Sequence, residues 1–156
     1  MSGKLLFLSF ALSLVGFLAV DSVAQTARKA VGAAEVNGTF RDYFGGKFKG
    51  NYNEIKILAL GGGKLRVAFN LTYPYVDSTG GMMANTGTAE GTATIEGDTA
   101  TFSPDDTDGC TITIKFVKPG AIKVAQQGAS ECGFGFNVSA DGNYKKTSAA
   151  KPRFDN

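Results

Sequence analysis

The side chains that most often carry acid–base and nucleophilic catalysis are scarce in this sequence. It contains no histidine, so Ser-His-Asp, Cys-His and histidine–metal devices are not available. Carboxylates remain: Glu90 and Glu96 fall on one face of an expected strand, as do Glu54 and Lys56. Glycosidase-type catalysis needs one carboxyl group in an apolar pocket that raises its pKa. Because the two glutamates alternate with apolar residues, we expect them to face water, and we expect no catalytic residues.

An acidic segment over residues 105–109, with the sequence Asp-Asp-Thr-Asp-Gly, resembles part of a calcium-binding loop. An EF-hand loop also needs an acidic residue at its first position and a glutamate at its twelfth. Pro104 and Lys115 occupy those positions here. We therefore expect a polar hairpin loop and no metal site, with weak calcium binding as the alternative.

The longest connection between expected strands, residues 73–86, is the candidate contact surface. It carries Tyr73, Tyr75, Val76, Met82 and Met83 where hairpin turns usually carry polar residues. Exposed aromatic rings and flexible methionine side chains suit an adaptable binding surface. The alternative is that this loop folds over the mouth of the domain as a hydrophobic plug.

The N-terminus has the pattern of a secretory signal. Lys4 precedes an apolar run over residues 5–20, and the small residues Ser22 and Ala24 follow at the positions that signal peptidase inspects. The apolar run is shorter than the about 20 residues that span a bilayer. We predict a cleaved signal peptide over residues 1–24, a periplasmic or secreted protein, and no membrane contact after cleavage. An uncleaved anchor is the alternative.

Cys110 and Cys132 are the only cysteines. Export would bring both to an oxidising compartment, where such a pair forms a disulfide. Closing a loop of this length is worth roughly 3 kcal/mol in the chain-entropy model. A metal pair would need further soft ligands, and a catalytic thiol would need a base such as histidine. We expect the disulfide, and we expect no cofactor.

The charge of the chain is close to balanced. The formal net charge is +2, and losing Lys4 and Asp21 with the signal leaves it unchanged. A nucleic-acid partner would require a strong basic field. The expected partners are therefore an unknown protein or a small apolar ligand, bound by a monomer, and nucleic acid is not expected.

Apolar residues alternate with polar ones through the middle of the chain, which is the pattern of half-buried strands. In one such run, Leu65, Val67, Phe69 and Leu71 alternate with Lys64 and other polar or small residues. Glycine-containing turns separate the runs. The predicted strands are 38–48, 53–60, 64–73, 86–96, 99–103, 110–117, 121–127 and 132–138, with a further short one over 142–146.

These strands predict an all-β fold built as a single antiparallel up-and-down meander of about eight strands. Closing the meander into a barrel removes exposed edges, so we expect a closed or nearly closed barrel, with a β-sandwich as the alternative. The barrel domain spans residues 37–147, after a flexible leader over 25–36 and before a flexible tail over 148–156.

The expected inward positions include several small residues, Ala89, Gly91 and Ala93. An eight-stranded barrel is just wide enough to be filled by side chains or to hold one small ligand. Small residues on one wall would leave a cavity for such a ligand. Alternatively, phenylalanines from the other wall fill the core: Phe102, Phe116, Phe134 and Phe136.

The last third of the chain resembles a group of small exported bacterial proteins of uncharacterised function with a lipocalin-like or calycin-like barrel. The resemblance is carried by Cys110-Thr-Ile-Thr-Ile-Lys-Phe116, Cys132-Gly-Phe-Gly135 and Gly142-Asn-Tyr-Lys-Lys146. It implies a barrel and a disulfide. True lipocalins begin with Gly-x-Trp, and this chain has no tryptophan, so no ligand is carried over.

Together these features favour an exported, non-catalytic binding module, with protein inhibition as one form of that role, because a rigid scaffold that presents one segment suits binding. An envelope structural protein without a specific ligand is the first alternative. A carboxylate-based hydrolase is the second.

Overall fold

The computed structural model describes residues 30–104, 107, 109–128 and 132–154. The predicted signal peptide, residues 1–24, lies outside the described residues, and so do three acidic residues of the calcium-like segment, at positions 105, 106 and 108. Within the described ranges, no helix has the length and apolar character needed to cross a bilayer.

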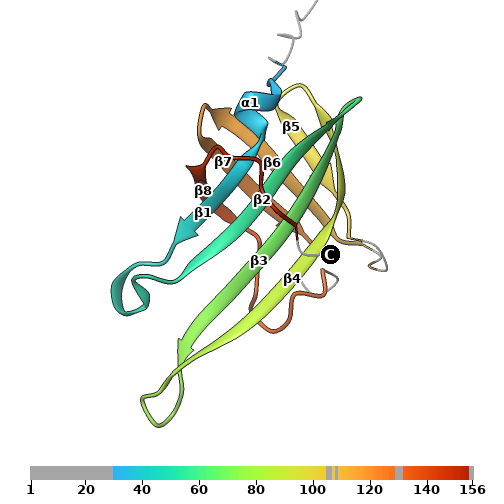
Figure 1. Ribbon diagram of the computed structural model, residues 1–156. Helices are drawn as coiled ribbons and strands as arrows, with labels where there is room; N and C mark the ends of the chain where they lie inside the picture. Colours follow the sequence, from blue (N-terminus) through green and yellow to red (C-terminus); the bar gives the residue numbers. More distant parts are fainter. Residues whose placement is uncertain (1–29, 105–106, 108, 129–131, 155–156) are drawn as a thin grey trace, which may run out of the picture.

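Eight antiparallel strands follow one another in chain order and close into a barrel, in which β8 pairs with β1 (Figure 1). The prediction of an up-and-down barrel is confirmed, and the sandwich alternative is wrong. The strands are β1 (Gly38–Tyr43), β2 (Tyr52–Gly61), β3 (Lys64–Val76), β4 (Met82–Glu96), β5 (Thr99–Phe102), β6 (Thr111–Lys118), β7 (Ala121–Gln127) and β8 (Gly142–Ser148). A short helix, α1 (Ala33–Val36), precedes β1, and a 3₁₀ turn, η1 (Gly46–Phe48), follows it.

The apolar and polar residues that alternate in the sequence become buried and outward-facing side chains that alternate along the strands. In β3, Leu65, Val67, Phe69 and Leu71 are each at most 2% exposed, while the residues between them face outward. Successive side chains of a strand point to opposite faces, so each strand contributes one face to a common interior. This interior is the hydrophobic core that holds the barrel together.

Side chains from all eight strands fill the interior. Phe69 packs against Phe102 and Phe134, with ring centroids 5.2 and 6.1 Å apart. The space in front of the small residues of β4 is occupied as well: a Cβ atom on Gly91 would lie 2.9 Å from the Phe102 ring. Gly91 therefore makes room for a large ring from the neighbouring strand β5, and the interior is filled as the filled-core alternative predicts.

The predicted strand over residues 132–138 is wrong. This segment is a loop between β7 and β8 that turns repeatedly, because Gly133, Gly135 and Asn137 have φ angles of 70°, 97° and 61°. Positive φ angles do not occur in a regular strand. Phe134 is consequently buried at 1% exposure, whereas Phe136, predicted to face inward, is 79% exposed.

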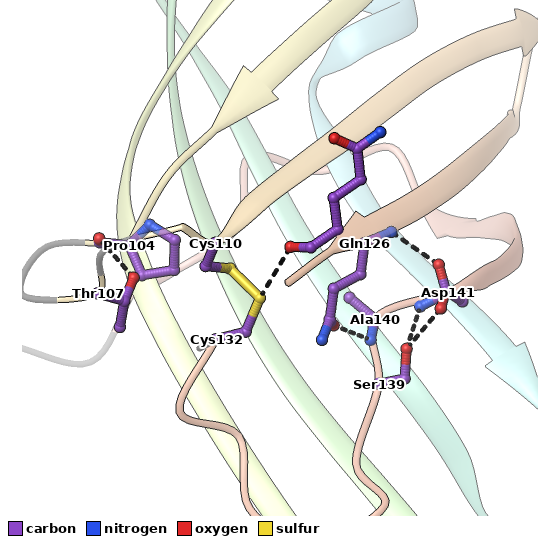
Figure 2. Close-up of a disulfide and its surroundings, with 9 residues drawn as sticks. Pro104, Thr107, Cys110, Gln126, Cys132, Ser139, Ala140 and Asp141 are labelled. Atoms are coloured by element: carbon purple, nitrogen blue, oxygen red, sulfur yellow. Dashed lines mark hydrogen bonds between the residues drawn. A yellow bond between two sulfur atoms is a disulfide. The ribbon is translucent and has the colours of Figure 1, made fainter. Parts of the chain in front are cut away.

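A disulfide joins Cys110, just before β6, to Cys132 in this loop, as predicted (Figure 2). Polar contacts hold the other end of the loop: the Gln126 amide side chain accepts a hydrogen bond from the Ala140 N–H at 2.8 Å, and the Asp141 carboxylate accepts one from the Gln126 N–H at 2.7 Å. The described part of the loop between β7 and β8 that follows Cys132, residues 132–141, is therefore attached to the barrel near both of its ends.

Part of the predicted leader belongs to the fold. Helix α1 lies within residues 25–36, and Val36 at its end is only 2% exposed. The Lys146 ammonium donates hydrogen bonds to the carbonyl oxygens of Ala34, Glu35 and Asn37 at 3.1, 2.7 and 2.8 Å. These are the carbonyl groups that a short helix leaves without internal partners, so Lys146 ties α1 to β8.

Candidate binding surface at the tip of the β3–β4 arm

Residues 73–86 do not form the long loop expected from the sequence, and they do not fold over the barrel mouth as a plug. Strands β3 and β4 continue through this segment as a paired hairpin, from Thr72 opposite Thr86 to Val76 opposite Met82. Figure 1 shows this hairpin extending away from the rest of the barrel, at the end opposite α1. We call residues 72–86 the arm. Tyrosine and valine favour strands, which is why pairing continues beyond the barrel wall.

The turn at the end of the arm is built around one carboxylate. Oδ1 of Asp77 accepts hydrogen bonds from the Thr79 N–H at 2.9 Å, the Thr79 hydroxyl at 2.8 Å and the Gly81 N–H at 2.8 Å. These bonds lower the pKa of the Asp77 carboxyl, and the bond from the Thr79 hydroxyl has the largest effect. The tip is thus a closed, hydrogen-bonded turn, and it holds the strand ends in register.

The five candidate residues are divided between the two faces of the arm. Tyr73, Tyr75 and Met83 continue the face that is inward in the barrel, while Val76 and Met82 lie on the opposite face. The two tyrosine rings stack with centroids 6.4 Å apart and planes inclined by 25°. Met82 is 69% exposed and Met83 50%. Both faces of the tip therefore present apolar side chains to solvent.

On the inward face, the arm and the loop between β7 and β8 form a surface pocket of about 410 Å³. Its lining comprises Tyr73, Tyr75, Asn85, Phe136 and Asn137. The Asn85 side-chain amide donates a hydrogen bond to the Phe136 carbonyl at 2.8 Å, which joins arm and loop. The exposed Phe136 ring thereby becomes part of the same apolar surface as the two tyrosines.

A second, smaller pocket of about 230 Å³ lies where the arm meets the connection between β1 and β2. It brings both methionines of the tip together with residues that the sequence did not indicate. The lining residues are Phe48, Asn51, Pro74, Met82, Met83 and Ala84.

Sequence reasoning missed Phe136 and Asn85 as members of this surface. Phe136 was assigned to the interior because it continues the period-two pattern of Phe134. The signal that contradicts the pattern is the glycine on either side of Phe134, since Gly133 and Gly135 permit the positive φ angles that turn the chain. Nothing in the sequence indicates that Asn85 contacts a residue 51 positions away.

A third pocket, of about 400 Å³, lies on the outer face of β2, β3 and β4, beneath the C-terminal tail. Phe154 from the tail covers one side of it, and the Arg66 guanidinium lies 4.5 Å from the Phe154 ring centroid. Two carboxylates, Glu54 and Glu90, line the pocket. This is the place where a carboxylate-based hydrolase would be sought.

Both carboxylates of the outer pocket are already engaged in ion pairs. Glu54 binds Arg41, with 2.7 Å between the charged groups, and Glu90 binds Arg66. A general acid needs a carboxyl group that is free to contact the substrate, and each of these two carboxylates already contacts an arginine. Burial does raise the pKa of the Asp42 carboxyl, but Asp42 lines none of the three pockets described. Within the outer pocket, neither described carboxylate is free of an arginine partner.

The described residues contain no cluster of three or more histidine, cysteine, aspartate or glutamate side chains suited to a metal ion. Four of the large apolar side chains that are exposed among the described residues lie on the arm: Tyr73, Val76, Met82 and Met83. No family model, curated protein or solved structure matches this chain, so the fold and the surfaces described above are the basis for a functional proposal.

Proposed function

We propose that this protein is an exported, non-catalytic binding module that captures a protein partner with the tip of its β3–β4 arm. The observation that carries the proposal is a paired hairpin projecting from the barrel with large apolar side chains exposed on both faces. The surface comprises Tyr73, Tyr75, Val76, Met82, Met83 and Phe136, which are exposed or lie along a surface pocket.

A protein partner fits this surface better than a ligand inside the barrel. The barrel interior is occupied by side chains such as Phe102 and Phe134, each at most 1% exposed. Aromatic side chains and methionines are enriched where proteins meet, and a few of them usually dominate the binding energy. The arm tip offers this composition on a scaffold held by a closed barrel and a disulfide.

A small apolar ligand is the second candidate, and one observation favours it. The pocket between Tyr73, Tyr75 and Phe136 measures about 410 Å³, a size within the range of small-molecule sites. Such a ligand would bind outside the barrel, against the arm, and not in the core.

Two features that are typical of exported proteins also support the proposal. The N-terminal pattern of Lys4, an apolar run and Ala24 is that of a secretory signal, and a structural disulfide suits an oxidising compartment. We therefore place the module in the periplasm or outside the cell, where it would meet envelope or extracellular proteins.

The test compares partner capture by two matched variants. The arm variant carries Tyr75→Ser, Met82→Ser and Met83→Ser. The control variant carries Leu60→Ser and Val117→Ser, which removes side chains of similar exposure, 54% and 52%, from the opposite end of the barrel. Each immobilised protein is exposed to an envelope extract from its own source, and retained proteins are quantified by mass spectrometry.

We expect a partner that the wild-type and control proteins retain and that the arm variant loses, with nearly unchanged melting temperatures for all three. Equal retention by the arm variant would contradict the proposal. Repeated absence of any specifically retained protein would favour the structural alternative, in which the module has no ligand.

A further inference from the structure

One edge of strand β4 lacks a neighbouring strand along most of its length. On that side β4 pairs with β5, which spans only four residues and reaches Thr94, Ile95 and Glu96 of β4. Over residues 82–93, no strand in the described part of the chain lies beside this edge. The strands pair in an order that closes the barrel, but β5 is much shorter than β4. Most of this edge of β4 is therefore left without a described strand to pair with.

The hydrogen bonds at both ends of the β3–β4 ladder fix which backbone groups face this edge. The Asp77 N–H donates to the Gly81 carbonyl, and the Ile95 N–H to the Gly63 carbonyl, both at 2.9 Å. The ladder between them runs without a register shift. Along an antiparallel ladder, hydrogen-bonded residue pairs alternate with pairs that are not hydrogen-bonded to each other. The odd-numbered residues of β4 therefore bond to β3, and the even-numbered ones direct their N–H and C=O groups to the open edge.

The residues that face the open edge are Met82, Ala84, Thr86, Thr88, Glu90 and Thr92. Among the described residues, no backbone hydrogen bond beyond the β3–β4 ladder involves them. The loop between β7 and β8 approaches β4 at Thr86, where a Cβ on Gly135 would lie 3.6 Å from the Thr86 carbonyl oxygen. Thr86 is nevertheless exposed, as are Thr88, Glu90 and Thr92 along the same edge.

This edge lacks the features by which proteins usually protect an unpaired strand: lysine, proline or a bulge. The opposite edge of the arm has one, because Pro74 occupies a position that faces away from β4 and has no N–H to offer. The only charged side chain along the open edge, Glu90, is neutralised by Arg66. An unprotected edge with these small side chains is complementary to another extended strand.

We propose that the open edge of β4 pairs antiparallel with β4 of a second copy, so that two barrels share a continuous sheet in a symmetric dimer. Pairing centred on Thr88 places Thr88 opposite its own copy and Thr86 opposite Glu90. No like charges then face each other, and threonine pairs across strands are favourable. In this proposal a dimer takes the place of the monomer expected in the sequence analysis, and its two arms point in opposite directions.

The first test is the oligomeric state of the full mature protein by sedimentation velocity over a concentration series. We expect a reversible dimer. Thr88→Lys places two ammonium groups opposite each other and should raise the dimer dissociation constant about tenfold or more. Asn70→Lys is the matched control, because Asn70 lies beside Thr88 on β3, on the same face but away from the edge; this variant should dimerise as the wild type does.

The second test identifies the edge directly by amide hydrogen exchange. With rising protein concentration, the amides of Thr88, Glu90 and Thr92 should become protected, while those of Ala89 and Gly91, already bonded to β3, stay protected throughout. A monomer at every concentration would overturn the proposal, and so would a dimer in which these three amides exchange freely. Neither result bears on partner capture by the arm tip, which is measured separately.

Discussion

The backbone of Phe134 passes so close to Gly87 that no side chain fits between them: a Cβ atom on Gly87 would lie 2.3 Å from the Phe134 carbonyl oxygen and 2.7 Å from its Cα. Gly87 faces the interior side of β4, opposite Leu71. The contact lets the loop between β7 and β8 cross beneath β4 and insert the Phe134 ring into the core. One small residue thus joins the base of the arm to the loop that carries Phe136.

The first prediction is that Gly87→Ala destabilises the protein by about 1–3 kcal/mol, because an added methyl group in a filled interior forces backbone to move. Urea unfolding measures the change. Gly45→Ala is the control, since a Cβ on Gly45 meets nothing within 4 Å and its φ of −97° suits any residue. Equal stability of the two variants would mean that the loop does not cross β4 as described.

The second prediction concerns the disulfide. Replacing Cys110 and Cys132 together with serine should lower the free energy of unfolding by roughly 3 kcal/mol, because the unfolded chain regains the entropy of an open loop. Amide exchange should also accelerate over residues 132–138, where the loop loses its covalent attachment to the barrel.

Reduction of the wild-type protein should reproduce both changes, while a reducing agent should leave the serine variant unaffected. Two freely titratable thiols in protein isolated after export would contradict the disulfide, and with it the oxidising compartment that the proposed function requires.

The third prediction is a loss of stability at alkaline pH through Tyr144. This side chain is 1% exposed, and its hydroxyl donates a hydrogen bond to the Ala140 carbonyl at 2.9 Å. Burial raises its pKa above the ordinary value, and the neighbouring Asp42 carboxylate adds to the effect. Because the folded state holds the proton more tightly than the unfolded state, the full stability is present below about pH 10, the ordinary tyrosine pKa, and is lost progressively above it.

The test measures urea unfolding of the wild type and of Tyr144→Phe from neutral pH to pH 12. The variant should be less stable at neutral pH by about 1 kcal/mol, because it lacks one hydrogen bond, and this difference should shrink as the pH rises above 10. A constant difference across the range would show that Tyr144 does not titrate differently in the two states.

The sequence predicted the barrel because its main determinant is local. Alternation such as that of Leu65, Val67 and Phe69 specifies which face of a strand is buried, and glycine-containing turns specify where strands reverse. Eight such strands in chain order leave few ways of burying one common face. The disulfide was predicted from two cysteines in a chain whose N-terminal sequence has the pattern of a secretory signal.

The candidate site was only partly predictable, because its geometry depends on contacts between distant residues. Composition indicated Met82 and Met83, but strand pairing, not composition, makes their segment a projecting arm. Phe134 and Phe136 belong to the same period-two pattern in the sequence, but Phe134 is buried and Phe136 is exposed in the structure. What separates them is the path of a loop set by the disulfide and by the contact with Gly87, and neither constraint is local.

The last prediction concerns the rigidity of the arm tip, on which the proposed partner capture would depend. Asp77→Ala removes the acceptor of three hydrogen bonds, so the amides of Thr79 and Gly81 should exchange faster and partner retention should fall. The unfolding midpoint should barely change, because the turn lies outside the barrel. Asp77→Asn is the control, since its carbonyl oxygen still accepts these bonds and should preserve the turn.

The pH dependence of the turn follows from the sign of the pKa shift. The Asp77 pKa is lowered, so the ordered turn stabilises the ionised carboxylate; this contribution is complete above the ordinary aspartate pKa of about 4 and is lost as the pH falls through the lowered value. Amide chemical shifts of Thr79 and Gly81 should therefore titrate in the wild type at a pH below the ordinary value and stay constant in Asp77→Asn. Titration at the ordinary value would mean that the turn opens freely in solution, and an open turn would remove the pre-organisation that a rigid contact surface needs.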